Sequence, residues 1–385
     1  MLGARMQTGP ATAQPLLAHL RRGLEELHPA YFAMVMATGV VSIVASRLGL
    51  REAAAALYRV NVPAYAVLWV LFAARAVAYP RRLLADLASH QRGPGFFTAV
   101  AATCVLGLQL AVLRGEAGAA YALFWLGLAL WGGCTYAVFV LLSIRAQKPS
   151  LAEGIHGGWL VAVVGTQSLV VLGAQVVAPR HGGSEAAFFL LAALWLAGGM
   201  LYLWMISLIF YRWMFFRVSP ADLLPPSWIN MGAVAISVVA GAALCDAARG
   251  SALLQGLLPF LRGLTLMFWA TATWWIPMLV LLGVWRHRGA SRIPFAYDPL
   301  YWALVFPLGM YSLASYRMGQ VFALPFLAWL AKAFAVVALC AWLLTFLGMT
   351  ARLIHLLLLA ARSLHRERGP VAPHTAAPDP MTRQS

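Results

Sequence analysis

The sequence predicts an all-α integral membrane protein with ten transmembrane helices, arranged as five successive hairpins. Three observations predict this fold class. Hydrophobic residues make up 62% of the 385-residue chain and charged residues only 10%, against roughly 25% charged residues in soluble domains. The chain contains ten mainly apolar stretches, each about as long as a helix needs to be to cross a bilayer. The connections between these stretches are short, which favours hairpins.

Charged residues and clusters of proline and glycine set the limits of the ten spans. The spans run approximately over residues 30–46, 56–79, 96–113, 119–143, 158–178, 187–213, 228–247, 257–285, 300–317 and 321–348.

The remaining segments complete the predicted organisation. Residues 1–29 form a cytoplasmic N-terminal segment without the apolar core of a signal peptide. Residues 30–348 form the transmembrane domain, and 349–385 form a cytoplasmic basic helix and a disordered tail. Residues 351–368 are apolar on several helical faces and basic at their end, so they are either an interfacial helix or a continuation of span ten. We favour the continuation.

The distribution of basic residues predicts the orientation in the membrane. The chain has a formal charge of +16, but no motif of a nucleic-acid-binding domain accompanies it. Basic residues concentrate in cytoplasmic loops of membrane proteins. Nineteen of the 28 Lys and Arg residues lie on the side of the two termini and eight on the other, with Lys332 inside a span. Both termini are therefore expected in the cytoplasm, and the excess of Arg over Lys suggests a bacterial inner membrane.

Tryptophans separate the spans into two classes. Twelve of the fifteen tryptophans fall in even-numbered spans, whereas the middles of the odd-numbered spans contain none. Large amphipathic rings suit lipid and its interfaces. The odd spans instead contain small and weakly polar residues, which allow close helix packing. We therefore expect five odd helices enclosed by five even ones.

Two interpretations of this inner ring stay open. The small residues either join the helices into a solid bundle or leave a lumen along its axis. The middles of the spans contain no Asp or Glu, and the nearest carboxylate is Asp246 at the end of span seven. Cation carriers and proton pumps usually place carboxylates at membrane depth, so a lumen here would favour anions. Lys332 would either contact such anions or, as we prefer, lie at a subunit interface or extend to the membrane surface.

Enzyme chemistry is not indicated. The histidines lie near termini and loops, without the HExxH pattern of a metalloprotease or the dyad of an intramembrane serine protease. The four cysteines are far apart, so we expect ordinary buried residues and neither a disulfide framework nor a metal site. We expect no catalytic residue, no metal and no cofactor.

Span nine carries the most individual motif. In the segment YDPLYWALVFPLGMYSLASYRM, Pro307 lacks an N–H and is expected to kink the helix beside Phe306. An aromatic ring held at a kink in a narrow lumen would gate it by excluding water. The alternative is that Phe306 is an ordinary core residue. On an unbroken helix Ser315 would point about 180° away from Phe306, so only one of the two would face the lumen.

The stretch VFPLGMYSLASY resembles the ninth helix of the tellurite-resistance/dicarboxylate transporter (TDT) family. This family includes plant guard-cell slow anion channels, a bacterial tellurite-resistance homologue, fungal malate permeases and sulfite pumps. HPAYFAMVMATGVVSI is similar to its first helix, GWLVAVVGTQSLVVLGA to its fifth and SWINMGAVAISVVAGAAL to its seventh. The resemblance covers about residues 24–348.

The resemblance implies a ten-helix fold with quasi-fivefold symmetry, a pore lined by the odd helices in each subunit, and a homotrimer. It also implies that Phe306, which precedes Pro307, occludes the pore. The long regulatory termini of the plant channels are missing. The remaining pore-lining candidates are small or polar residues of odd spans: Thr38, Gly39, Gly165, Thr166, Gln167, Ser237 and Ser312.

The predicted function is transport of small inorganic or organic anions through a pore gated by a phenylalanine at a helix kink. One alternative is a secondary carrier or exporter of a C4-dicarboxylate such as malate, or of sulfite. A more distant alternative is a membrane scaffold that transports nothing. The predicted partners are the anion, the lipid bilayer and two further copies of the chain.

Overall fold

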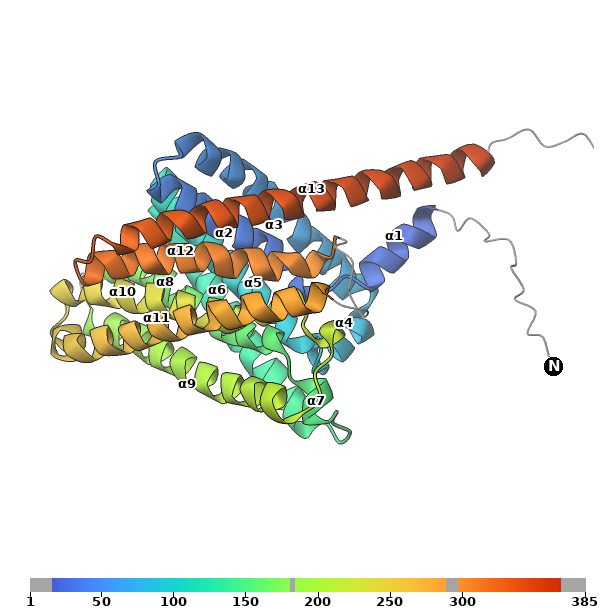
Figure 1. The fold of residues 1–385 in the computed structure, drawn as a ribbon. Coiled ribbons are helices and arrows are strands. Elements are labelled where there is room, and N and C mark those ends of the chain that lie inside the picture. Colours follow the sequence, from blue (N-terminus) through green and yellow to red (C-terminus); the bar gives the residue numbers. More distant parts are fainter. Residues whose placement is uncertain (1–15, 181–183, 289–296, 368–385) are drawn as a thin grey trace, which may run out of the picture.

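The computed structural model describes residues 16–180, 184–288 and 297–367, and within these ranges every regular element is a helix (Figure 1). Ten of these helices have at least thirteen residues. They are α2 (Ala33–Arg47), α3 (Arg51–Ala78), α5 (Phe97–Gln109), α6 (Ala117–Ile144), α8 (Val161–Arg180), α9 (Glu185–Phe215), α10 (Ile229–Ala247), α11 (Ala252–His287), α12 (Trp302–Val321) and α13 (Leu327–Glu367). Three shorter helices, α1 (Leu16–Glu25), α4 (Pro80–Leu87) and α7 (Leu151–Gly154), complete the described α-helices.

Nine helical stretches in the described ranges are long and apolar enough to cross a membrane. They correspond to all of the predicted spans except the ninth, which is α12. This helix has twenty residues, but Arg317, Gln320 and several hydroxyl-bearing residues near its end dilute its apolar character.

The largest differences from the predicted spans are at α13. The helix begins at Leu327, six residues later than predicted, because Phe322 to Phe326 form the connection from α12. Lys332 consequently lies in the second turn of α13, where it is exposed, and not deep in a span. The helix then continues without interruption to Glu367, so the basic stretch after residue 350 belongs to it. The predicted disordered tail lies outside the described residues.

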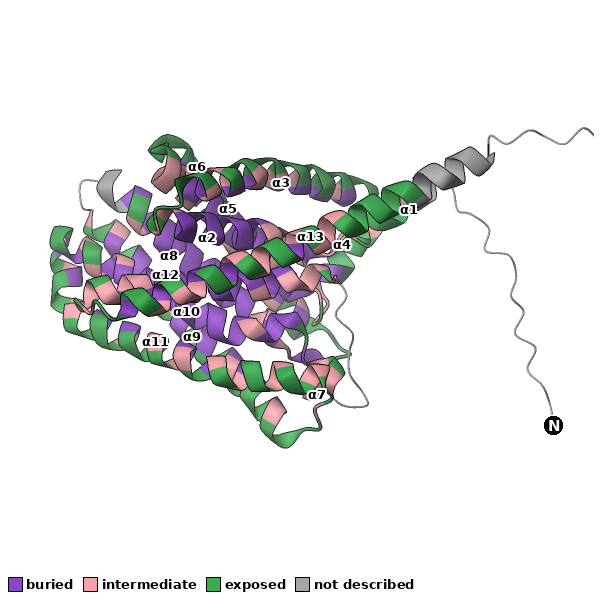
Figure 2. Cartoon of the chain, turned by 45° about the horizontal axis from the view of Figure 1, so that its top comes forward, coloured by how far each residue is buried: buried purple, intermediate pink, exposed green. Residues whose placement is uncertain are grey.

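Five helices form a closed inner ring. Helix α2 contacts α5, α5 contacts α8, α8 contacts α10, α10 contacts α12, and α12 contacts α2 again. Their middles are buried on all sides, and Figure 2 shows them as the buried centre of the molecule. A helix that is apolar all around is suited to this position, because each of its faces meets another helix.

The other five long helices pack outside this ring. Each of α3, α6, α9, α11 and α13 contacts the inner helix that precedes it in the chain and also the next inner helix of the ring. Their outward faces expose large apolar side chains, as expected for a surface that meets lipid (Figure 2). Among these exposed side chains are Trp125, Trp204, Trp274 and Trp329.

Each inner helix begins with a short 3₁₀ turn. The five turns are η1 (Pro29–Phe32), η2 (Gly93–Phe96), η4 (Gly157–Leu160), η6 (Pro225–Trp228) and η8 (Pro299–Tyr301). They contact one another in the same closed order as the helices that follow them. At one of these contacts a Cβ on Gly157 would lie 2.8 Å from the Cα of Ser227, so only glycine fits there. All five inner helices therefore start at the same end of the bundle.

Candidate functional site

Two cavities lie at opposite ends of the inner ring, and all five inner helices or their 3₁₀ turns line each of them. We name them by the helix ends that surround them. The N-terminal cavity has a volume of about 170 Å³ and receives polar groups from His28, Gln91, Arg92, Thr98 and His156. The C-terminal cavity has a volume of about 280 Å³. Its polar and charged lining consists of Arg47, Gln175, Asp246 and Arg317.

The helix register places an apolar layer between the two cavities. On α12, Ala303 lines the N-terminal cavity, and Leu313 and Arg317 line the C-terminal one. Phe306 follows Ala303 by three residues and precedes Leu313 by seven, so all four residues share one face of the helix. Phe306 has no exposed surface.

The same register identifies the residues of the other inner helices that share the level of Phe306. Each lies between a residue of its helix that lines the N-terminal cavity and one that lines the C-terminal cavity. All of them are buried and apolar. They are Val40 on α2, Ala101 on α5, Val164 on α8 and Ile236 on α10.

Pro307 lies inside α12, and its ring fits against a glycine of the neighbouring inner helix. A Cβ on Gly232 of α10 would lie 2.7 Å from Cγ of Pro307, so a larger residue there would displace one of the two helices. On the other side of α12, a Cβ on Gly309 would lie 3.0 Å from Cγ1 of Val40. The helix that carries Phe306 is thus held closely between α10 and α2.

The hydroxyl groups predicted to line the pore have hydrogen-bond partners on outer helices or on their own helix. Thr38 accepts a hydrogen bond of 2.9 Å from the indole of Trp342 on α13. Thr166 accepts one of 2.8 Å from Trp131 on α6. The hydroxyl of Ser237 donates to the carbonyl of Ala233, one turn earlier.

Gln167 and Ser312 also contact outer helices. The amide nitrogen of Gln167 donates to the carbonyl of Trp195 on α9 over 3.0 Å. The hydroxyl of Ser312 donates to the carbonyl of Ala331 on α13 over 2.7 Å.

Gly39 and Gly165 lie at contacts between inner helices. A Cβ on Gly39 would lie 2.4 Å from Cγ1 of Val105 on α5. A Cβ on Gly165 would be 3.4 Å from Cβ of Val100, also on α5. Both glycines therefore face α5, where they allow a close approach of helices. A role for the seven lining candidates in contacting an anion stays a prediction.

The hydrogen bonds of the hydroxyls belong to a pattern that includes all five outer helices. Each outer helix gives one aromatic hydrogen-bonding group to the inner helix that follows it in the ring. The five pairs are Tyr65 with Thr103, Trp131 with Thr166, Trp195 with the carbonyl of Ser237, Trp269 with Ser315, and Trp342 with Thr38. Ser315 thus points towards α11, on the opposite side of α12 from Phe306. Several tryptophans predicted to face lipid instead bind the inner ring, because a buried indole N–H needs an acceptor.

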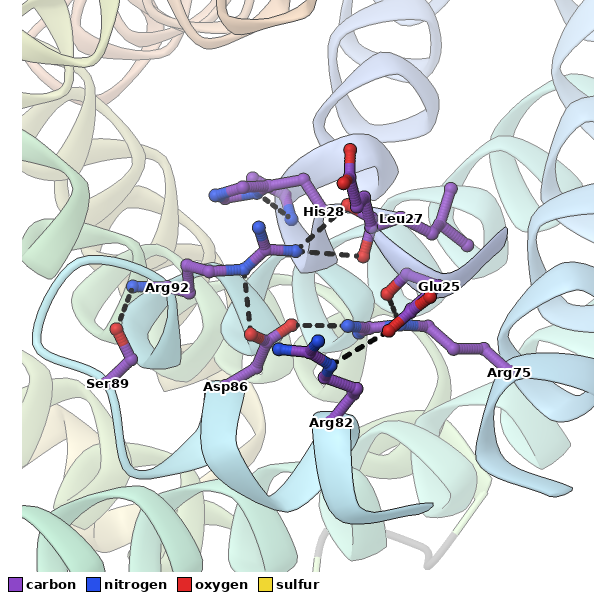
Figure 3. A network of polar contacts seen from close by, with 10 residues as sticks. Glu25, Leu27, His28, Arg75, Arg82, Asp86, Ser89 and Arg92 are labelled. Atoms are coloured by element: carbon purple, nitrogen blue, oxygen red, sulfur yellow. Dashed lines mark hydrogen bonds and ion pairs between the residues drawn. The ribbon is translucent and has the colours of Figure 1, made fainter. Parts of the chain in front are cut away.

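Arg92 connects the N-terminal cavity to a polar network on α1, α3 and α4 (Figure 3). Its guanidinium forms an ion pair of 2.9 Å with Asp86 and donates to the carbonyls of Glu26 and Leu27. Asp86 is also paired, at 2.7 Å, with the fully buried Arg75. Two guanidinium groups share one carboxylate, so the network has an excess of positive charge beside the cavity.

Two histidines cap inner helices at the same cavity. Nδ1 of His28 accepts from the backbone N–H of Ala30, and Nδ1 of His156 accepts from that of Gly158. Burial, and then the charge of Arg92, lower the pKa of His28 to about 4. Burial, and then the charge of Arg212, lower the pKa of His156 to about 4. Both rings are therefore neutral near pH 7.

At the C-terminal cavity, Arg317 of α12 forms an ion pair with Asp246 of α10. Asp246 is the one carboxylate among the residues that line this cavity, and Arg47 and Arg317 are its two basic residues. The carboxyl-terminal ends of the five inner helices, with their partial negative charge, also meet here. The two arginines oppose that charge.

Sequence reasoning did not identify the two histidines and Arg92 as candidate site residues. Each directly precedes one of the five 3₁₀ turns, as does Asp298, whose carboxylate caps η8. The signal that could have found them is a repeated pattern: a polar residue, then proline or glycine, then an aromatic residue three or four positions later. It occurs as HPAYF, RGPGF, HGGW and DPLYW.

The described residues include no group of three or more His, Cys, Asp or Glu side chains that could hold a metal ion. All four cysteines are free, as expected, but only Cys104 is buried. Cys340 is exposed on α13 because that side of the helix faces away from the inner ring.

Known proteins similar to this chain are membrane proteins and transporters. The Mycobacterium tuberculosis sequence described as an uncharacterized membrane protein is 37% identical over 161 residues, which are 41% of this chain and 80% of that protein. An uncharacterized transporter of Methanocaldococcus jannaschii is 24% identical over 78% of this chain and 86% of its own length. The sulfite efflux pump SSU1 of Trichophyton rubrum is 25% identical over 84% of this chain and 90% of its own.

The family comparison covers the whole helical bundle. The model of the voltage-dependent anion channel family, SLAC1, matches residues 26–350, which include all five inner helices and both cavities. This family is the group with slow anion channels that the motif of span nine resembled. The chain therefore belongs to the SLAC1 voltage-dependent anion channel family, within the tellurite-resistance/dicarboxylate transporters, as an integral membrane protein.

Proposed function

We propose that this protein moves small anions across a membrane along the axis of its inner ring, and that Phe306 closes this path midway. One observation carries the proposal. Two cavities at opposite ends of the ring are each lined by all five inner helices, and a buried apolar layer containing Phe306 lies between them. An apolar constriction of this kind blocks ions by excluding water. Pro307, packed against Gly232, sets the position of the Phe306 ring.

The charge distribution supports anions as the transported species. The amino-terminal ends of five helices, which carry partial positive charge, converge on the N-terminal cavity together with Arg92. Arg47 and Arg317 line the opposite cavity, where one carboxylate is present and already paired. Between the cavities the path contains no charged side chain among the described residues.

The names of the relatives suggest which anion to test first. The matching fungal proteins are sulfite efflux pumps, so sulfite is the first candidate and C4-dicarboxylates such as malate are the second. A closed apolar layer fits a gated channel. It also fits a carrier that opens its two cavities in turn, which is the alternative function.

The remaining features of the proposal concern the assembly. We infer ten spanning helices, residues 30–348, with quasi-fivefold symmetry, and the closed contact order of the inner helices and of the five 3₁₀ turns supports this. The excess of basic residues places the N-terminal cavity and both termini in the cytoplasm of a bacterial cell. The family resemblance supports a homotrimer and a transporter that is not an enzyme. Lys332, exposed near the start of α13, extends to the membrane surface or lies at the trimer interface.

The decisive test is anion flux through the purified protein in liposomes. Sulfite, chloride, nitrate and malate are loaded one at a time, and their release is compared with that from protein-free liposomes and with the release of potassium. Release of at least one anion without release of potassium is expected. Equal leakage from both kinds of liposome, for a protein that remains folded in the bilayer, would favour the scaffold alternative.

A further inference from the structure

The hydrogen bonds of His28 and His156 fix where each ring carries its proton. In both residues Nδ1 accepts a hydrogen bond from a backbone N–H, at 3.0 Å for His28 and 3.1 Å for His156. A ring nitrogen that accepts such a bond carries no proton. The proton of each neutral ring is therefore on Nε2, which makes Nε2 a hydrogen-bond donor.

These two donors have no acceptor in the part of the chain that the structure describes. Nε2 of His156 is inaccessible to solvent and has no hydrogen-bond partner. The hydrogen bonds of His28 likewise involve Nδ1 and not Nε2. Leaving a buried donor unpaired costs about 1–3 kcal/mol, so a structure that keeps one beside a cavity favours an acceptor from outside the protein.

The surroundings of the two rings define what that acceptor is. His28 and His156 line the N-terminal cavity together with Arg92, a permanently charged donor. The charged groups nearest to His28 are Arg92, Asp86 and Arg75, and Arg212 is the nearest charge to His156. The carboxylate of Asp86 is already paired with two arginines. The cavity therefore offers a visitor donors and positive charge.

We propose that the N-terminal cavity is a binding site for an oxyanion, in which Nε2–H of His28 and Nε2–H of His156 donate to different oxygen atoms and Arg92 supplies the opposite charge. The site deepens the proposed transport function and rests on it. His28 and His156 belong to η1 and η4, which are separated in the ring by η2. Donors on two separated turns are matched by an ion with several oxygen atoms, such as sulfite or a carboxylate, better than by a single chloride.

The test uses a substitution that removes the donor and keeps the cap. In His156→Asn the amide oxygen takes the place of Nδ1 and still caps η4, but nothing replaces Nε2–H. The concentration of sulfite that half-saturates flux into liposomes is measured for this variant and for His28→Asn. Loss of one net hydrogen bond, worth about 0.5–1.5 kcal/mol, predicts an increase of roughly two- to tenfold for each. The value for chloride should change less.

Two further variants make the result specific. His90→Asn replaces a nearby histidine that packs against Trp159 and does not line the cavity, and it should leave the half-saturating concentration as in the wild type. His156→Gln places an amide N–H near the position of Nε2 and loses the cap, so it should recover part of the affinity for sulfite and lower the unfolding temperature.

The outcomes separate this site from the proposed function. If the wild type conducts sulfite but both His→Asn variants have unchanged half-saturation, the binding site is wrong and the transport function stands. If chloride is affected as strongly as sulfite, the preference for oxyanions is wrong. If the wild type conducts no anion, the transport function itself is wrong. Thermal unfolding of each variant with and without sodium sulfite gives the same comparison without flux, because a ligand of the folded state raises the unfolding temperature.

Discussion

The indole nitrogen of Trp131 on α6 donates a hydrogen bond of 2.8 Å to the hydroxyl of Thr166 on α8. This bond joins an outer helix to the inner ring, and the same kind of contact occurs at four other places. Thr166 also donates to the carbonyl of Ala162 on its own helix. The hydroxyl is thus used as donor and as acceptor, which is the full satisfaction expected of a buried polar group.

The first prediction concerns this pair. Thr166→Val and Trp131→Phe should each destabilise the protein, by about 0.5–1.5 kcal/mol for the lost hydrogen bond. The double variant should be less destabilised than the sum of the two, because the same bond is lost in both. Denaturant unfolding in detergent measures this coupling. Additive effects, combined with a changed anion selectivity in Thr166→Val, would instead support the predicted pore-lining role of Thr166.

The second prediction tests the gate. Phe306→Ala should increase anion flux several-fold, because it opens the apolar layer between the two cavities and admits water. Liposome flux of sulfite and chloride measures the effect. Phe124→Ala is the matched control, since Phe124 is equally buried but lies on the outer helix α6.

Both substitutions remove a buried phenylalanine, which costs about 3–5 kcal/mol, so general loosening should affect both variants alike. A folded Phe306→Ala protein with wild-type flux would contradict the gate. Equal increases in the two variants would show leakage caused by instability.

The third prediction concerns the C-terminal cavity. Asp246→Asn should lower the half-saturating anion concentration about two- to fivefold at low ionic strength, because it removes the carboxylate that pairs with Arg317. At about 1 M salt the difference should disappear, since the screening length is then only about 3 Å.

Glu116→Gln is the control for this charge change. Glu116 precedes α6 at the same end of the bundle, where its ion pair with Arg114 is exposed, and it does not line the cavity. If it has the same effect as Asp246→Asn, the influence of Asp246 is not specific to the cavity.

The fourth prediction follows from the lowered pKa values of His28 and His156. Each is about 4 in the folded protein, against 6.5 as the ordinary value. Between these two values the unfolded chain binds a proton at each residue that the folded chain does not bind, so acidification favours unfolding. The stability contributed by the neutral rings is present above about pH 6.5 and is lost as the pH falls towards 4.

Unfolding temperatures of the wild type and of the His28→Asn/His156→Asn double variant, measured from pH 7.5 to 4.5, test this. The wild type should lose more stability than the double variant over this range. Parallel curves would contradict the pKa assignment.

The sequence predicted the spans well because a bilayer imposes a simple composition on a helix that crosses it. The limits of α6 and α9 differ from the predicted spans by two residues or fewer at each end. Errors were larger where the limit depends on a turn: α11 starts five residues earlier than predicted and α13 six residues later. Hydropathy alone also misses α12, the helix of Phe306, because its final turns carry polar residues.

The candidate site was predicted less completely. Phe306 was found from its neighbour Pro307 and from the resemblance of the surrounding motif. The polar residues of the odd spans were chosen because a hydroxyl group needs a partner in the membrane, and this requirement is met at Thr38 and Thr166. Their partners are indoles of outer helices. Residue type alone cannot distinguish a partner on a neighbouring helix from an ion in a lumen.

The sequence by itself determined that the chain spans a membrane, that tryptophan-rich helices alternate with helices of small residues, and that acidic groups are absent from the middles of its spans. These properties depend on composition and on order along the chain. Only the tertiary structure decided that the inner helices close into a ring, which places His28, Arg92 and His156 around one cavity although 128 positions separate the two histidines. The physical reason is that a cavity is formed by residues from helices far apart in sequence, and the packing that brings those helices together sets which side chains face it.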